Sequence, residues 1–400
     1  MSEKIVVVVG SIVSAGEYEP NYFWVIDFSN VPAEPPSPVQ VLLPFQGSGC
    51  VVDCSGTLAA VGNSTGPGIV TIYDISDPAV PRYIGDTGAA LSPEGYNFNG
   101  IGAISFYAGY VLAAEANGRR VALIEMGSLQ SPDVYETGLD TLADVAIFGQ
   151  YAVFCGTSVY KNAFQVANVN SNSDNYNLPS LQYAATTSFS DAVEYSPAFC
   201  DFDGVNAVFS DGTGVYVFGI SDGTPTASPV VPSGGELAPL TSVTIAESQN
   251  AEGVYSGGVM TAWAGPGSQY VNLSFFKPPT PEANVFGTSA SLGDLPNTYG
   301  SPNQNGAALK FSRTINGTSA LLATAGVTQT ASGVQEYVVS LFNVSTAYSH
   351  GHGSIDVTQQ GQSAIVQLRS TLDATIGIAT FYTFPVPPFP VPFPHRIEEL

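Results

Sequence analysis

The chain has 400 residues and a formal net charge of −23, from 10 Lys and Arg against 33 Asp and Glu. Charged residues make up only 11% of the chain, well below the quarter that is usual in soluble domains. A nucleic-acid-binding surface needs a basic stripe along the phosphates, and the few cations here are scattered, so we expect no nucleic-acid partner.

At the N-terminus, Met1 to Lys4 precede a short apolar run. This run is too short for the core of a secretory signal and far too short to cross a membrane, so we expect a protein that does not span one. A chain poor in charge and rich in Ser, Thr, Asn, Tyr and Gly is typical of extracellular or virion β-proteins. We therefore expect an extracellular or virion-surface location without a recognisable signal peptide.

Two kinds of strand recur along the chain. Strands of aliphatic and aromatic residues that favour an extended backbone are expected at 23–29, 70–76, 121–126, 164–169, 215–222, 271–276 and 338–345. Before each of these lies a strand rich in Ala and Val, at 5–10, 58–63, 111–115, 151–156, 207–211, 260–265 and 321–326, and an eighth such segment is at 375–380. Copies that return every 40 to 60 residues or so indicate the four-stranded blades of a β-propeller.

A third set of short, apolar segments is expected to form the innermost strands of the blades, at 51–53, 103–106, 145–148, 198–200, 243–246, 307–311 and 364–368. The fold class is therefore all-β, a β-propeller over residues 1–383. Seven blades are favoured and eight remain possible. The closing blade is expected to combine N-terminal strands at 5–9 and 23–28 with C-terminal strands at 364–368 and 375–382, although this leaves one strand too many.

The clearest copy reads Val70-Thr71-Ile72-Tyr73-Asp74-Ile75-Ser76-Asp77-Pro78-Ala79-Val80-Pro81. It is a strand that runs into a turn, because Pro78 cannot donate to a ladder. This segment resembles the LVIVD-type repeat, a family of β-propeller repeats. The resemblance implies a propeller of a kind found mostly in surface or secreted proteins, with no defined catalytic residues.

Motifs for chemistry are few, and we expect no catalytic, cofactor-binding or metal-binding residues and no enzyme activity. The run 62–66 fits G-x-S-x-G, but another strand follows it where a nucleophile elbow needs a helix. His350 and His352 lie in a glycine-rich loop without a third ligand. The Asp-Phe-Asp-Gly at 201–204 favours a hairpin turn over a calcium loop.

The four cysteines show no disulfide pattern. Cys50 and Cys54 share one predicted strand and are therefore about 13 Å apart, too far to bridge. Cys155 and Cys200 end neighbouring predicted strands, and the favoured interpretation is a pair of buried free thiols. Four glycosylation sequons begin at Asn63, Asn272, Asn316 and Asn343, so an attached glycan is possible.

Residues 384–400 form a separate Phe- and Pro-rich tail. Its docking residues are expected to be Phe384, Pro385, Val386, Pro387, Pro388, Phe389, Pro390, Val391, Pro392 and Phe393. Prolines at this density enforce a polyproline II rod, which cannot join a sheet and carries an apolar surface. The rod is expected either to dock on a neighbouring subunit or to strap its own propeller.

Two functions follow from these features. The favoured one is a non-catalytic structural or interaction protein, a propeller subunit of an extracellular or virion assembly whose partners are copies of itself or other subunits. The alternative is a propeller that binds a ligand or glycan, or acts on one as an enzyme, through its central pocket. The apolar tail and the lack of clustered His, Cys or basic residues favour the first.

Overall fold

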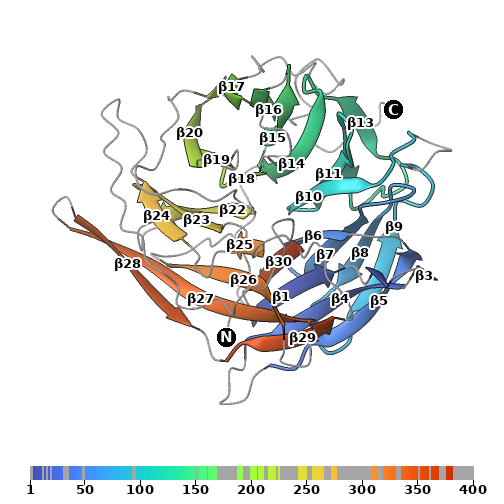
Figure 1. Cartoon of the computed structure of the whole chain (residues 1–400), viewed down its shortest axis with the longest axis horizontal. Coiled ribbons are helices and arrows are strands. Elements are labelled where there is room, and N and C mark those ends of the chain that lie inside the picture. The colour runs from blue at the N-terminus through green and yellow to red at the C-terminus, as the bar shows by residue number, and fades with distance from the viewer. Residues whose placement is uncertain are drawn as a thin grey trace, which may run out of the picture.

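The computed structural model describes the chain over a set of segments that alternate with gaps. These are residues 3–10, 13–14, 17–18, 20–29, 36–46, 50–91, 96–149, 151–159, 161–168, 187–191, 199–204, 206–210, 215–221, 224–225, 242–249, 255–264, 272–276, 308–312, 319–329, 335–349, 352–359, 362–368 and 375–381. All regular structure within these segments is β-strand, arranged as sheets around a common centre (Figure 1). The fold is an all-β propeller, as the repeats predicted.

Four consecutive four-stranded blades follow one another along the chain. The first contains β6 (Cys50–Ser55), β7 (Leu58–Asn63), β8 (Val70–Asp74) and β9 (Arg82–Asp86). The second contains β10 (Ile101–Tyr107), β11 (Tyr110–Glu115), β12 (Arg120–Glu125) and β13 (Asp133–Glu136). The third contains β14 (Thr141–Phe148), β15 (Tyr151–Ser158), β16 (Lys161–Asn168) and β17 (Thr187–Asp191). The fourth contains β18 (Phe199–Phe202), β19 (Asn206–Ser210), β20 (Val215–Ser221) and β21 (Thr224–Pro225).

The fully described part of the ring thus has four blades, fewer than the seven or eight predicted for the whole chain. Further sheets are described by their backbone pairing. One contains β22 (Ser242–Gln249), β23 (Tyr255–Ala264) and β24 (Asn272–Phe276). Another contains β25 (Ala308–Phe311), β26 (Ser319–Gln329), β27 (Gln335–Ser349) and β28 (His352–Gln359), with β29 (Ala364–Leu368) also on β27. A small hairpin joins β2 (Val13–Ser14) to β3 (Glu17–Tyr18).

The two ends of the ring meet in one sheet. Its order is β30 (Thr375–Phe381), β1 (Glu3–Gly10), β4 (Pro20–Asp27) and β5 (Val39–Gln46). In the pairing of β1 with β30, Glu3 is opposite Phe381 and Val9 is opposite Thr375. The prediction that N- and C-terminal strands share a sheet is confirmed.

The prediction for one strand of that sheet was wrong. Residues 364–368, expected in the closing blade and at the centre of the ring, form β29 and pair with residues 335–339 of β27. β30 takes the innermost place in the closing sheet, and β5, which follows a Pro-rich segment, supplies the fourth strand. The strand left over from the predicted count therefore belongs to the preceding sheet, because β27 is long enough to pair with two partners.

The innermost strands contact one another in a closed series. β6 contacts β10, and the contacts then run through β14, β18, β22, β25 and β30 before returning to β6. Figure 1 shows these strands around the middle of the ring. Six of them match the segments expected to be innermost, and β30 occupies the seventh place instead of β29.

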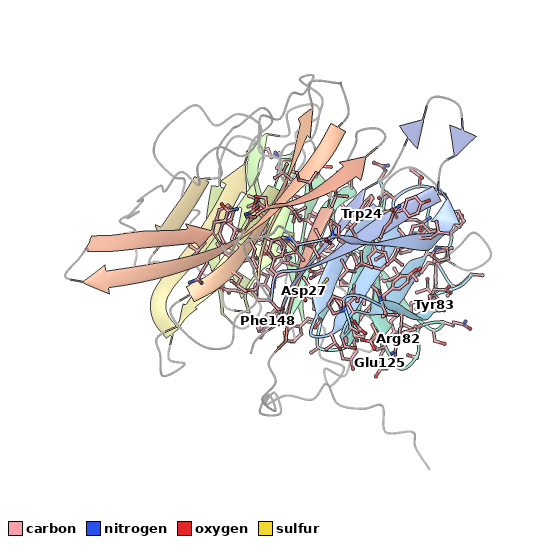
Figure 2. All side chains as sticks on the ribbon, turned by 90° about the horizontal axis from the view of Figure 1, so that it is seen from below. Trp24, Asp27, Arg82, Tyr83, Glu125 and Phe148 are labelled. Carbon is pink, nitrogen blue, oxygen red and sulfur yellow. The ribbon has the colours of Figure 1, made fainter. Side chains whose placement is uncertain are left out.

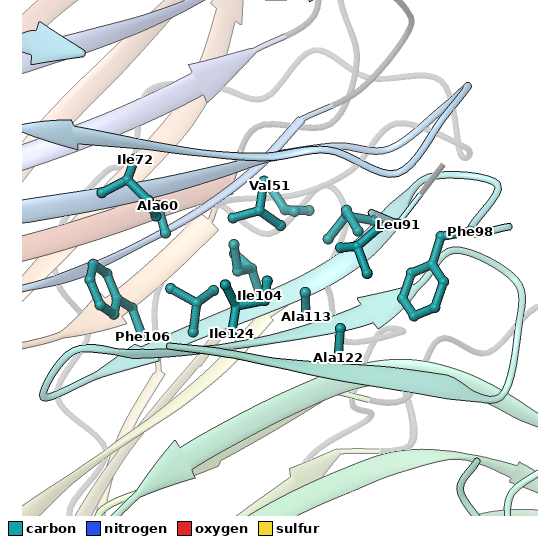
Figure 3. Packing of buried hydrophobic residues seen from close by; sticks show 13 residues of the cluster. Val51, Ala60, Ile72, Leu91, Phe98, Ile104, Phe106, Ala113, Ala122 and Ile124 are labelled. Atoms are coloured by element: carbon teal, nitrogen blue, oxygen red, sulfur yellow. The ribbon is translucent and has the colours of Figure 1, made fainter. Parts of the chain in front are cut away.

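The hydrophobic core lies between neighbouring blades. Both faces of a blade are covered, so the second strands are buried at almost every position, whereas the outer strands β9 and β13 are largely exposed. One cluster joins Ile72 of β8 to Ile104 and Ile124 of the next blade (Figure 3). Small residues are required where strands converge, because a Cβ on Gly156 would stand 1.9 Å from the carbonyl oxygen of Thr141.

The turn after β8 explains the aspartates of its repeat. Asp74 Oδ1 accepts a hydrogen bond from the N–H of Ser76 at 2.9 Å, and this bond holds the pKa of the carboxyl below its usual range. Asp27 accepts from the N–H of Ser29 in the same way at 2.7 Å. Aspartate is the preferred residue for such turns, so in these two copies its role is structural.

Candidate functional site

Three aspartates and one lysine on described innermost strands form a charged group, here named the axial cluster: Asp53, Asp144, Asp201 and Lys310. Each lies on an innermost strand, β6, β14, β18 and β25 respectively. Lys310 Nζ lies 3.3 Å from Asp201 Oδ1 and 4.0 Å from Asp53 Oδ1. The neighbours of β25 in the ring are β22 and β30, so the Lys310 side chain reaches across the centre to strands on both sides.

The carboxylates of the axial cluster also fasten one blade to the next. Asp53 Oδ2 accepts a hydrogen bond from the N–H of Phe106 at 2.8 Å, and Asp144 Oδ2 accepts one from the N–H of Cys200 at 3.0 Å. Ser105 Oγ performs the same task without a charge, since it accepts from the N–H of Ile147 at 3.1 Å. These inter-blade hydrogen bonds satisfy backbone donors that would otherwise be orphaned in a buried place.

A second hydrogen bond fixes each carboxylate to its own strand. The N–H groups of Cys54, Val145 and Phe202 donate to the aspartates that precede them, at 2.9, 2.8 and 3.0 Å. The side chains of Asp53 and Asp201 are only 4% and 5% exposed, and that of Lys310 is 19% exposed. A buried carboxylate is tolerated only when it is paired and hydrogen-bonded, so Lys310 is the cation on which this arrangement depends.

Asp144 differs from the other two aspartates. Desolvation of its carboxyl raises its pKa to about 7, although the N–H donors of Cys200 and Val145 and the charge of Lys310 act in the opposite direction. The folded protein therefore binds a proton at Asp144 more tightly than the unfolded chain does, in which the pKa is about 3.9. Stability contributed by this proton is fully present below about pH 4 and is lost as pH rises through about 7.

We expect Asp144→Asn to remove this pH dependence. Asparagine does not titrate, so the wild type should gain stability relative to the variant between pH 8 and pH 5. Urea unfolding at a series of pH values measures the difference. Ser105→Ala is the matched control, because it removes an uncharged inter-blade hydrogen bond and should shift stability equally at each pH. A constant gap between wild type and Asp144→Asn would contradict the assignment.

The sequence did not single out the axial cluster. Lys310 was one of the scattered cations, Asp201 was considered only as part of the turn at 201–204, and Asp53 and Asp144 were given no role. A signal was present, since the aspartates lie in or directly beside three of the predicted innermost strands and Lys310 lies inside a fourth. The recurrence of aspartate at matching positions of the innermost strands could have revealed the cluster.

The structure shows where the sequence motifs considered for catalysis or metal binding lie. Residues 62–66 connect β7 to β8, so a strand follows as expected. Asp203 accepts from the N–H of Asn206 at 2.7 Å in the hairpin between β18 and β19, and Gly204 has a φ of +100°. His352 begins β28, whereas His350 lies outside the described residues. Over the segments that the structure describes, no three His, Cys, Asp or Glu side chains are grouped as metal ligands.

All four cysteines are buried free thiols, as was favoured for Cys155 and Cys200. Burial raises the pKa of Cys50 to about 12 and also raises the pKa of Cys155. Thiols with raised pKa values hold little thiolate and are poor nucleophiles. Cys50 and Cys54 lie at opposite ends of β6.

The sequons fall in different environments. Asn63 is 1% exposed, and its Nδ2 donates to the carbonyls of Thr65 and Pro67 at 2.9 and 2.6 Å. A glycan on that nitrogen conflicts with this packing, so Asn63 serves to hold its loop. Asn343 is half-buried in β27, and Asn272 is placed by its backbone in β24. Asn316 and the docking residues of the tail lie outside the described residues.

Comparisons with known proteins show a similarity of fold only. No family model matches the chain, and no curated protein matches its sequence. Among solved structures, apo AztD from Citrobacter koseri matches with a TM-score of 0.50 and 9% identity, over 94% of this chain and 98% of that one. The RRP9 WD40 repeats match with a TM-score of 0.45 and 11% identity, over 80% and 89%. The beta-propeller domain of Cps50 (Swd1) from Myceliophteria thermophila matches with a TM-score of 0.39 and 9% identity, over 78% and 90%.

No helix in the described segments is long and apolar enough to cross a membrane.

Proposed function

We propose that this protein is a non-catalytic, seven-bladed β-propeller that serves as a structural or interaction subunit of an extracellular or virion assembly. Its C-terminal tail docks on a neighbouring subunit. The LVIVD-type repeat family is the proposed origin of the blades. The closed series of contacts among innermost strands supports seven blades, because each sheet contributes one strand to that series.

The hydrogen bonds and the ion pair of the axial cluster support the proposal that the protein is non-catalytic. Asp53 and Asp144 each accept one hydrogen bond from their own strand and one from the next blade, and Asp201 pairs with Lys310. A general acid or base needs a proton-transferring atom within reach of a substrate. In the axial cluster those atoms are occupied in holding the ring together, which favours a rigid module over an active site.

The composition of the tail supports the proposed role in assembly. Three Phe and two Val between its prolines form an apolar surface that water solvates poorly, and a rigid rod loses little entropy when it binds. The net charge of −23 opposes association of copies, so contacts between them must come from apolar groups such as these.

The alternative, a ligand- or glycan-binding and possibly enzymatic propeller, has one observation in its favour. Lys310 keeps 19% of its side chain exposed beside three carboxylates at the ring centre, where a polar ligand could meet both signs of charge. The inter-blade hydrogen bonds of Asp53 and Asp144 weigh against it, because a ligand would have to compete with them.

The form of the full-length protein in solution tests the proposal. We expect sedimentation velocity and electron microscopy to show an oligomer, filament or shell. Association should strengthen as salt screens the negative charge or as mild acid neutralises it. A protein that stays monomeric from low to high concentration under all these conditions would contradict a role as an assembly subunit.

A further inference from the structure

The outer edge of the first fully described blade carries an unusual apolar group of residues. Among the described residues, seven large hydrophobic side chains are strongly exposed, and three of them lie within five positions of one another. Val80 is 56% exposed, Tyr83 55% and Ile84 48%. We call these three residues the β9 patch. Single exposed apolar residues are ordinary, whereas three in one short segment, here on either side of the exposed Arg82, indicate a contact site.

The backbone at the β9 patch is poorly suited to pairing with another strand. β9 is the last strand of its sheet, and the register shifts between Ile72 opposite Gly85 and Tyr73 opposite Tyr83. Ile84 is therefore an unpaired bulge residue. A bulge twists an edge away from regular pairing, which is one way in which proteins prevent strand addition. The partner that fits this edge is therefore one that binds without adding a hydrogen-bonded β-strand to the sheet.

The aromatic ring in the β9 patch is held in place before any partner binds. The Tyr83 ring meets the edge of the Tyr73 ring, with centroids 6.0 Å apart, and the Tyr83 hydroxyl donates to Asp86 Oδ2 at 2.7 Å. Tyr73 in turn packs on Phe23, with centroids 4.6 Å apart. Proline-rich segments in the polyproline II conformation are recognised by such exposed, fixed aromatic surfaces.

The tail has the matching chemistry. Its prolines lack N–H groups, so it cannot act as a strand, and its Phe, Val and Pro side chains need an apolar surface. Arg396 follows the rod closely and is one of only 10 Lys and Arg in the chain. The β9 patch flanks the exposed Arg82 and is bordered by Asp74, Asp77 and Asp86, so negative charge is in excess beside it and favours a basic partner.

Strand β30, which precedes the tail in the chain, ends on the face of the ring that carries the β9 patch. Phe381 is opposite Glu3, and Ile5 is opposite Asp27, so β30 ends on the face where β4 ends. Figure 2 shows Asp27, Arg82 and Tyr83 toward that face. A four-stranded blade spans roughly 14 Å from its innermost to its outermost strand. A polyproline II rod of eleven residues is about 34 Å long, which is more than the width of one blade.

From these observations we propose that the β9 patch is the docking site for residues 384–396 of a second copy of this chain. The inference rests on the proposed function and specifies the surface that receives the tail. Two copies that face each other would each give a tail and receive one, which makes the contact self-complementary and closes a pair.

The test compares two double variants of the full-length protein. Val80→Ser with Ile84→Ser removes the aliphatic part of the β9 patch and keeps Tyr83 in place. Leu42→Ser with Ile365→Ser is the matched control, since these residues are 59% and 51% exposed on other strands. Sedimentation equilibrium should show association at least ten-fold weaker for the first variant and unchanged for the control.

A synthetic peptide of residues 384–400 provides the second measurement. It should dissociate the wild-type assembly and bind the β9-patch variant at least ten-fold more weakly than the control. Equal association of both variants would overturn the docking site and leave the proposed assembly role standing. A wild-type protein that is monomeric and binds no added peptide would overturn docking on a second copy and the proposed assembly role together.

Discussion

Replacement of Lys310 by Met should destabilise the propeller by about 3 kcal/mol. Removal of one partner from a buried ion pair costs more than the pair itself contributes, because an uncompensated charge stays behind. Lys310 is the cation for Asp201 at 3.3 Å and Asp53 at 4.0 Å, and both carboxylates are almost completely buried. With an unfolding entropy of roughly 2.1 cal/mol/K per residue, the expected fall in Tm is about 3 to 4 °C.

The pH dependence of the Lys310→Met variant identifies the cause. The charge of Lys310 also holds down the pKa of Asp144, so its loss leaves the ionised Asp144 less compensated at pH 8 than the protonated form at pH 5. The loss of stability should therefore be smaller at pH 5 than at pH 8. Arg119→Met is the control, because Arg119 and Glu136 form a pair at 3.0 Å whose side chains are 58% and 61% exposed. Exposed pairs contribute about 0 to 1 kcal/mol. Equal melting temperatures for the two variants would show that the axial cluster does not depend on its lysine.

Deletion of residues 384–400 should abolish assembly and leave the propeller folded. The last strand of the closing sheet ends at Phe381, and a polyproline segment contributes no ladder hydrogen bonds. Burial of three Phe and two Val side chains at roughly 1.5 to 3 kcal/mol each gives a gross gain of about 7 to 15 kcal/mol. The costs of association reduce this gain, but one such contact at each subunit is enough to decide whether a polymer forms.

Thermal melts and sedimentation of the full-length and shortened proteins separate two roles of the tail. Loss of association with an unchanged Tm supports docking between subunits. A lower Tm for the shortened protein with association untouched would mean that the tail straps its own propeller. Full replacement of Phe384, Phe389 and Phe393 by Ser, with the prolines kept, is a second variant that removes the apolar groups without shortening the chain.

The sequence predicted the propeller because its strands repeat with a residue pattern that local physics determines. The aliphatic and aromatic strands, β8 above all, and the small-residue strands such as β7 both returned at each repeat. Pairing partners are set by contacts that no local pattern contains. β29 reads like an innermost strand, and only the unusual length of β27 shows that a second partner could be placed beside it.

The axial cluster escaped prediction for the same reason. Lys310 and Asp201 are 109 positions apart, and their contact exists only because the ring places β25 close to β18, with β22 between them. The identity of a residue does not show whether its side chain is paired in the interior or exposed to solvent. The sequence therefore did not indicate that Lys310 and Asp201 form a pair. The roles of turn residues are easier to predict from sequence, because Asp74 and Asp203 accept hydrogen bonds from N–H groups only two or three positions away.

The sheet shared by β1 and β30 also sets the order of events during synthesis. While the ribosome is still adding residues, β1 and the blades after it can form, but β30, which completes the sheet, emerges after all of them. Until residues 375–381 appear, the β1 edge stays open, and an open strand edge invites pairing with other chains. Closure joins segments more than 360 positions apart, a contact that forms slowly. The nascent chain is thus most prone to aggregate before residues 375–381 have paired with β1.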